Sequence, residues 1–164
     1  MKIKLLIIFF LLNSLVSFSQ IDTAAPYWKN KNLPAFVLLN MDSSSYANAA
    51  LSKDKYTIIM LFNPECEHCQ EQFKLLINMP EVSASCQVVL SSTETMDKIK
   101  FFYEKFNVAH YPFIHLAKDD QYVFGKFFQP KTIPVLACYD NKQQFIDIKQ
   151  GQANKEEIRK WLKQ

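Results

Sequence analysis

The chain has 164 residues, of which 49% are hydrophobic and 21% are charged. This length and composition indicate one globular domain that can bury a core without disulfide cross-links, and the 2 Gly and 7 Pro exclude collagen-like and flexible-linker sequence. The net charge is only +3 and the lysines are interspersed with acidic residues, so the charge pattern does not indicate nucleic-acid binding.

The N-terminal segment has the pattern of a secretory signal peptide. Two lysines precede an uninterrupted apolar run over residues 5–12, and Ser17 and Ser19 are the small residues expected before a cleavage site at Gln20. The apolar run is too short for a membrane span, which needs about 20 residues. We therefore expect removal of residues 1–19, no stable membrane insertion, and a soluble mature protein in the periplasm or another extracytoplasmic compartment, where disulfides persist.

The mature chain begins with a polar lead-in over residues 20–32, and the remaining domain covers residues 33–164. Residues 33–39 are predicted to form a first strand, and the Ser-rich stretch at 42–45 a turn. Residues 56–62 form a continuous apolar run of strand length, which is typical of a strand covered on both faces. We expect this strand to lie at the centre of the sheet.

A helix is predicted directly after the central strand. Cys66, Cys69, Phe73 and Leu76 recur at spacings of three and four residues, and the helix is expected to end near Pro80. Both cysteines then lie in the first helical turn.

The later elements continue an alternating pattern. They are a strand at 86–90, a helix at 96–106, an extended piece at 112–116, a short helix at 122–128, a β-hairpin of strands 135–139 and 144–148, and a closing helix with a capping-box-like start at Asn154 and Glu157. This order predicts an α/β fold with a central mixed β-sheet flanked by helices and an N-terminal strand extension.

The motif Cys66-Glu67-His68-Cys69 carries the chemistry, because it stands where a strand meets a helix. The unpaired N–H groups and the dipole at a helix N-terminus favour the thiolate form of Cys66, and Cys69 is placed to attack a mixed disulfide formed on Cys66. His68 and Glu67 are expected to tune this chemistry in opposite directions. A zinc site and a structural disulfide are the alternatives, but structural zinc takes four ligands and the other cysteines stand singly.

With a second motif, Ile133-Pro134 at the start of a strand, the sequence resembles the thioredoxin superfamily, specifically its TlpA-like branch of periplasmic thiol-disulfide oxidoreductases. Residues 33–36 resemble the N-terminal strand of that branch, Cys66 and Cys69 its redox pair, and Pro134 its cis-proline. The resemblance implies a thioredoxin-like fold with Pro134 against the redox pair and Ile133 pairing its backbone with substrate.

The same resemblance implies the activity and the partners. We expect disulfide exchange with exported proteins or with a membrane electron donor, without a cofactor and in the direction of a reductase. A disulfide oxidase or isomerase remains an alternative, because the direction depends on redox potential and not on the motif.

Three positions depart from the pattern of the family. Glu65 stands where a Trp often precedes the first cysteine, and Met60 stands where cytoplasmic thioredoxins carry a buried Asp. Gln72, with Glu71 beside it, stands where TlpA-like reductases often carry Glu. The usual proton acceptor for Cys69 is therefore not where the family places it.

Cys86 and Cys138 are expected to be buried thiols at the end of the sheet far from Cys66, on two strands that a third strand separates. Strands so separated are too far apart for a disulfide, which needs Cα atoms within about 7 Å.

A different class of function is a copper-delivery module that binds metal through Cys66, Cys69 and either His110 or His115. Otherwise the two histidines are expected to lie on the surface or to be satisfied in the core.

Overall fold

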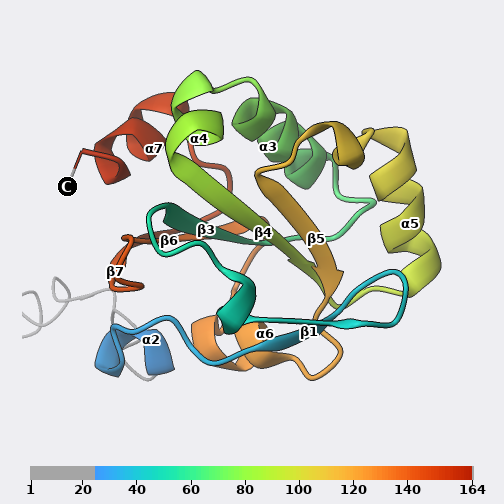
Figure 1. The fold of residues 1–164 in the computed structure, drawn as a ribbon, viewed down its shortest axis with the longest axis horizontal. Helices are drawn as coiled ribbons and strands as arrows, with labels where there is room; N and C mark the ends of the chain where they lie inside the picture. The colour runs from blue at the N-terminus through green and yellow to red at the C-terminus, as the bar shows by residue number, and fades with distance from the viewer. Residues whose placement is uncertain (1–24, 164) are drawn as a thin grey trace, which may run out of the picture.

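The computed structural model describes residues 25–163, which form a seven-stranded mixed sheet with helices on both faces (Figure 1). The strands are β1 (Val37–Leu39), β2 (Ser45–Ala47), β3 (Tyr56–Leu61), β4 (Cys86–Ser92), β5 (Ile114–Lys118), β6 (Val135–Tyr139) and β7 (Phe145–Gln150). Their order across the sheet is β2-β1-β5-β4-β3-β6-β7. The predicted signal peptide, residues 1–19, lies outside the described residues.

Six helices and two 3₁₀ turns accompany the strands within residues 25–163. They are α2 (Pro26–Lys29), α3 (Glu67–Ile77), α4 (Pro80–Ser85), α5 (Met96–Lys105), α6 (Val123–Phe128), α7 (Lys155–Trp161), η1 (Asn48–Ala50) and η2 (Val108–His110). In Figure 1, α3, α4 and α7 lie above the sheet, whereas α2 and α6 lie below it. None of the helices in residues 25–163 is long and apolar enough to cross a bilayer.

Strand β3 is central, as its apolar sequence predicts. It pairs in parallel with β4 on one side and antiparallel with β6 on the other, and its residues 57–61 are all buried. Strand β5 adds in parallel to β4. Because β3, β4 and β5 are parallel, the chain leaves all three strands at the same end of the sheet, and this end carries the motif that follows β3.

The sheet separates two apolar cores, which explains why β3 needs no polar face. Phe73 of α3, Phe102 of α5 and Trp161 of α7 belong to one core, and Tyr27 of α2 and Phe128 of α6 belong to the other. The first core fixes α3 by a tight aromatic contact, because the rings of Phe73 and Phe102 meet edge to face with centroids 5.2 Å apart. Packing on the sheet therefore sets the position of α3 and of the Cys66–Cys69 motif at its start.

The predicted helix ends near Pro80, as expected, but a second helix that was not predicted follows it. Helix α3 ends at Ile77, and Pro80 begins a separate helix, α4. Proline is suited to the first turn of a helix because its fixed φ matches the helix and its missing N–H would have no partner there.

The first strand is shorter than predicted, since only Val37–Leu39 joins the sheet. The preceding residues are held by a side chain: Asn48 accepts from the amide of Phe36 at 2.7 Å and donates to the carbonyl of Pro34 at 2.9 Å. These bonds satisfy backbone groups that a strand partner would otherwise satisfy. Strand β2, which pairs with β1, was not predicted.

The C-terminal hairpin and helix follow the prediction closely. Strands β6 and β7 pair antiparallel, and Gly151 after them has φ +84°, a left-handed conformation that favours glycine. Asn154 and Glu157 form a reciprocal capping box at the start of α7. The predicted α/β architecture, with its N-terminal strand extension, is confirmed.

Candidate active site

The redox motif begins in the loop that joins β3 to α3. Cys66 is the N-cap of α3, so it stands one residue ahead of the first helical residue and not within the first turn as predicted. Its amide donates to the carbonyl of Asn63 at 3.1 Å, and its carbonyl accepts from the amide of Gln70 at 3.0 Å. The side chain of Gln70 also donates to the carbonyl of Pro64 at 2.8 Å. The loop and the first turn of α3 are thus bonded into one unit.

The two sulfurs of the motif differ in access and in acidity. Cys66 is half-buried, whereas Cys69 is fully buried, and their thiols share a hydrogen bond. Burial raises the pKa of the Cys69 thiol to about 12, the hydrogen bond to Cys66 acts in the same direction, and a hydrogen bond from the main chain of Asn63 offsets them in part. All four cysteines are free thiols in this structure. The arrangement suits Cys66 to meet a partner from solution and Cys69 to react only with Cys66.

Glu67 and His68 lie in the exposed first turn of α3 between the two cysteines. Within residues 25–163 neither side chain has a hydrogen-bond or ion-pair partner. Their predicted influence on the redox pair therefore stays a prediction that must act through space.

Ile133 and Pro134 lie at the same end of the sheet as Cys66. Val135, the first residue of β6, stands opposite Leu61, the last residue of β3, so the segments that continue from both emerge together. The Ile133–Pro134 bond is cis, as expected. Pro134 is buried, whereas Ile133 is 36% exposed. An exposed apolar residue beside the redox loop suits contact with another protein.

Gln72 ties the redox helix to the C-terminal part of the chain. Its side chain is 1% exposed, and its Oε1 accepts from the amide of Ala153 at 2.7 Å. Its Nε2 has no hydrogen-bond partner within the described residues. One turn after Cys69, α3 therefore carries a buried neutral amide.

A ring of four residues, which the sequence analysis did not find, links residues 63–65, here called the redox loop, to α5. Lys98 lies 2.7 Å from Glu65 and 3.2 Å from Glu94, and Glu94 accepts from the side chain of Asn63 at 2.7 Å. The amide of Glu65 closes the ring by donating to Asn63 Oδ1 at 2.8 Å. Lys98 lies in the first turn of α5, whereas Glu94 lies in the connection just ahead of the N-cap of that helix, Thr95. No signal in the sequence shows that they meet residues 63–65.

Cys86 and Cys138 are buried at the opposite end of the sheet, as predicted. Cys86 stands beside Tyr56 and Cys138 beside Ile58, both near the start of β3, which separates them. Burial raises the pKa of both thiols, that of Cys86 to about 12. Neither cysteine takes part in the site around Cys66.

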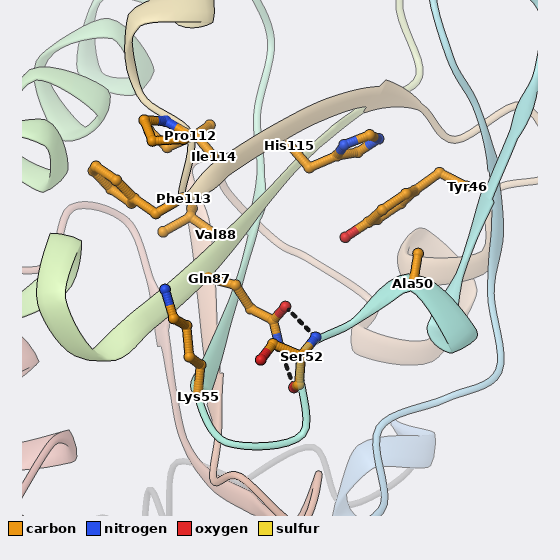
Figure 2. A pocket seen from close by; sticks show the side chains of 10 residues that line it. All are labelled: Tyr46, Ala50, Ser52, Lys55, Gln87, Val88, Pro112, Phe113, Ile114 and His115. Carbon is orange, nitrogen blue, oxygen red and sulfur yellow. Dashed lines mark hydrogen bonds between the residues drawn. The ribbon is translucent and has the colours of Figure 1, made fainter.

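At this far end of the sheet, His115 lines a cavity of about 360 Å³ (Figure 2). The imidazole stacks on the ring of Tyr46 with centroids 3.4 Å apart, and its Nε2 lies 2.8 Å from Asn40 Oδ1. Figure 2 shows the side chain of Gln87, one of the residues that line the cavity, hydrogen-bonded to the backbone of Ser52. The cavity opens at the starts of β4 and β5, away from the redox motif.

These positions do not assemble the copper site that the sequence left open. His115 is bonded to Asn40 at the far end of the sheet, and His110 is exposed in η2. Residues 25–163 contain no group of three or more His, Cys, Asp or Glu side chains placed to hold a metal ion.

Comparison with known proteins supports the fold. No family model and no curated protein matches the chain. Among solved structures, it is similar to a secreted Mycobacterium tuberculosis disulfide oxidoreductase homologous to Escherichia coli DsbE, with 15% identity, a TM-score of 0.60, and coverage of 78% of this chain and 94% of that one. It is also similar to StoA from Bacillus subtilis, with 13% identity, a TM-score of 0.61, and coverage of 81% and 99%.

A third similar structure is the pneumococcal exposed lipoprotein thioredoxin from Streptococcus pneumoniae, with 15% identity, a TM-score of 0.61, and coverage of 79% of this chain and 98% of that one. The chain therefore has the thioredoxin-like fold that the sequence resemblance predicts.

Proposed function

We propose that this chain is an extracytoplasmic thiol-disulfide oxidoreductase that acts as a reductase on the disulfides of exported proteins. The observation that carries the proposal is the pairing of a half-buried Cys66 at the N-cap of α3 with a fully buried Cys69, in hydrogen-bond contact, on a thioredoxin-like fold. The more accessible sulfur, that of Cys66, starts the reaction, and the buried sulfur of Cys69 completes it.

The reaction is a two-step exchange. The Cys66 thiolate attacks one sulfur of a substrate disulfide, so that a mixed disulfide forms and the other substrate sulfur leaves as a thiolate. Cys69 then loses its proton and attacks the Cys66 sulfur, forming the Cys66–Cys69 disulfide and releasing the second substrate thiolate. Two electrons pass from the cysteine pair to the substrate, and the two protons that the pair loses balance the protonation of the two substrate thiolates.

Helix α3 favours the first step and burial delays the second. Unpaired N–H groups at the helix N-terminus stabilise negative charge at Cys66. Cys69 stays protonated at neutral pH because burial raises its pKa to about 12. The mixed disulfide removes the charge and the hydrogen bond at Cys66, two of the smaller causes that raise this pKa, and so favours the attack by Cys69.

Ile133 and Pro134 are proposed to form the substrate-binding side of this site. The exposed Ile133 lies at the end of the sheet where Cys66 emerges, and backbone pairing with an extended substrate segment is a common mode of peptide recognition. Such pairing would place a substrate disulfide beside Cys66 without selecting a particular side chain.

The extracytoplasmic location rests on the leader-like N-terminal sequence and agrees with the descriptions of similar proteins as secreted or exposed. As a reductase outside the cytoplasm, the chain needs a donor that returns electrons to the oxidised pair. We assign that role to a membrane electron donor.

Catalysed reduction of insulin by dithiothreitol tests the activity. We expect the wild type and Cys86→Ser to accelerate reduction equally, and Cys66→Ser to give no acceleration. Equal rates with wild type and Cys66→Ser would contradict the proposal. A reductase should also have a reduction potential nearer to about −270 mV, typical of thioredoxin, than to about −120 mV, typical of a strong disulfide oxidant.

A further inference from the structure

Two carboxylates flank the cysteine whose thiolate the proposed reaction needs. Glu65 directly precedes Cys66, and Glu67 directly follows it. A carboxylate beside a thiol disfavours the thiolate, because two negative charges repel each other. Of these two carboxylates only that of Glu65 has a cationic partner within the described part of the chain, and this partner is Lys98.

Lys98 reaches the loop from α5, a helix that lies beside it through the packing of the first core. Its Nζ bridges Glu65 and Glu94, and Glu94 in turn accepts from Asn63. Asn63 Oδ1 accepts from the amide of Glu65, so the contacts form a closed ring from α5 through the loop and back. The hydrogen bonds to Glu65 and Glu94 raise the pKa of Lys98, which keeps its charge on the ring.

The ring acts on the backbone that presents Cys66. Residues 63–65 are the connection between β3 and the N-cap of α3, and the carbonyl of Asn63 also accepts from the amide of Cys66 at 3.1 Å. The ring therefore fixes the loop on one flank of Cys66, while it holds the Glu65 carboxylate against an ammonium group. An isolated exposed ion pair contributes little, but a closed network in which each partner is already oriented loses less side-chain entropy.

We propose that Lys98 is a positioning residue for the thiol chemistry, which compensates the charge of Glu65 and holds the redox loop so that the thiolate of Cys66 is favoured. The inference rests on the proposed oxidoreductase function. It names a residue outside the Cys66–Cys69 motif that shifts the reduction potential of the pair. Stabilising the thiolate stabilises the reduced pair, so Lys98 makes the pair more oxidising than its flanking carboxylates alone would.

The test compares Lys98→Met with Lys100→Met, an equal loss of charge on the same helix. Lys100 is exposed and has no ion-pair partner within residues 25–163. In equilibrium with glutathione, Lys98→Met should favour the disulfide form by about threefold relative to wild type, and Lys100→Met should leave the equilibrium unchanged. The alkylation rate of Cys66 should reach half its maximum at a higher pH in Lys98→Met, and Lys98→Arg should restore both values.

A second background shows whether Lys98 acts through Glu65. In Glu65→Gln the added Lys98→Met substitution should change the equilibrium less than it does in the wild type, because the carboxylate to be compensated is gone. Equal effects of Lys98→Met and Lys100→Met would overturn the proposal, as would an undiminished effect in Glu65→Gln. If the wild type does not exchange with glutathione at all, the oxidoreductase function fails, whereas the pH profile of Cys66 alkylation still decides the role of Lys98.

Discussion

Leu61 of β3 stands opposite Val135 of β6 in the antiparallel register of the sheet. The chain leaves β3 toward Cys66 and enters β6 from Pro134, so this one pairing brings two segments that are far apart in sequence to the same end of the sheet. The amide of Gly151 adds a third segment there, because it donates to the carbonyl of Pro134 at 2.8 Å. The register of the strands therefore assembles the segments that carry Cys66, Pro134 and Gly151 at one end of the sheet.

Replacing the buried sulfur should trap the first intermediate. With Cys69→Ser, the mixed disulfide on Cys66 has no internal thiol to resolve it, so complexes with exported proteins should accumulate to levels at least about tenfold above wild type. Non-reducing electrophoresis of cell extracts measures them. Cys66→Ser should form no such complexes, and Cys138→Ser should behave as wild type. Complexes that persist in a Cys66→Ser, Cys69→Ser double variant would show that another cysteine reacts.

The two distant thiols should make stability depend on alkaline pH. Burial raises the folded-state pKa of Cys86 to about 12 and also raises that of Cys138, whereas an unfolded thiol titrates near about 8.5. The contribution of the two thiols to the free energy of unfolding is therefore complete below about pH 8.5. It declines above that pH, because the thiols ionise in the unfolded chain but stay protonated in the folded one. Each thiol should add about 1.4 kcal/mol per pH unit to this decline within the window.

Urea unfolding of wild type and of Cys86→Ala, Cys138→Ala at pH 8 and pH 10 checks this effect. The double variant should be less stable at pH 8, because it loses buried volume, but its free energy of unfolding should fall less between the two pH values. An equal fall in both proteins would show that the buried thiols do not control the alkaline limb.

The two residues between the cysteines should shift the redox equilibrium in opposite directions. His68→Ala removes a group that can stabilise the Cys66 thiolate, so the reduction potential should fall. Glu67→Gln removes a repelling carboxylate, so the potential should rise. Both side chains are exposed, and shifts of about 10–30 mV are expected in glutathione equilibria. Shifts of the same sign would show that loop structure, and not charge, controls the effect.

Introducing a carboxyl group at position 72 should make the fold sensitive to pH. Gln72→Glu keeps an oxygen that can accept from Ala153 but buries an ionisable group, whose pKa should rise on folding. The variant should therefore match wild type most closely near pH 4–5 and lose about 1–3 kcal/mol more at pH 8, where the unfolded carboxyl is ionised. Glu71→Gln, at the exposed neighbouring position, is the matched control and should show no such dependence. Equal destabilisation at both pH values would indicate a steric effect.

Much of this fold could be predicted, because the decisive signals are local. The apolar run at 56–62 gives a strand covered on both faces, and the spacing of Cys69, Phe73 and Leu76 gives the buried face of α3. The capping box of α7 was likewise visible from Asn154 and its partner three residues later. These elements are governed by neighbours within one or two turns, which a sequence displays directly.

The contacts that surround the redox pair could not be predicted, because they join distant parts of the chain. Gln72 meets Ala153 across 81 positions, and Asn63 meets Glu94 across 31. Neither contact leaves a periodic or spacing signal, since each depends on how a loop lies against a helix after the sheet has formed. For the same reason the sequence does not show that the Asn48 side chain bonds the backbone of Pro34 and Phe36, which leaves the first strand shorter than predicted.

Titration of the wild-type protein with glutathione redox buffers, followed by acid quenching, alkylation of the denatured chain and mass mapping of each cysteine, tests whether the Cys66–Cys69 pair is the redox centre. We predict one two-electron transition: as the buffer becomes more oxidising, Cys66 and Cys69 together cease to be alkylated. Cys86 and Cys138 should be alkylated throughout. The proposed function would be contradicted if Cys66 and Cys69 stayed reduced across the whole titration, or if the cysteines that became oxidised were Cys86 and Cys138.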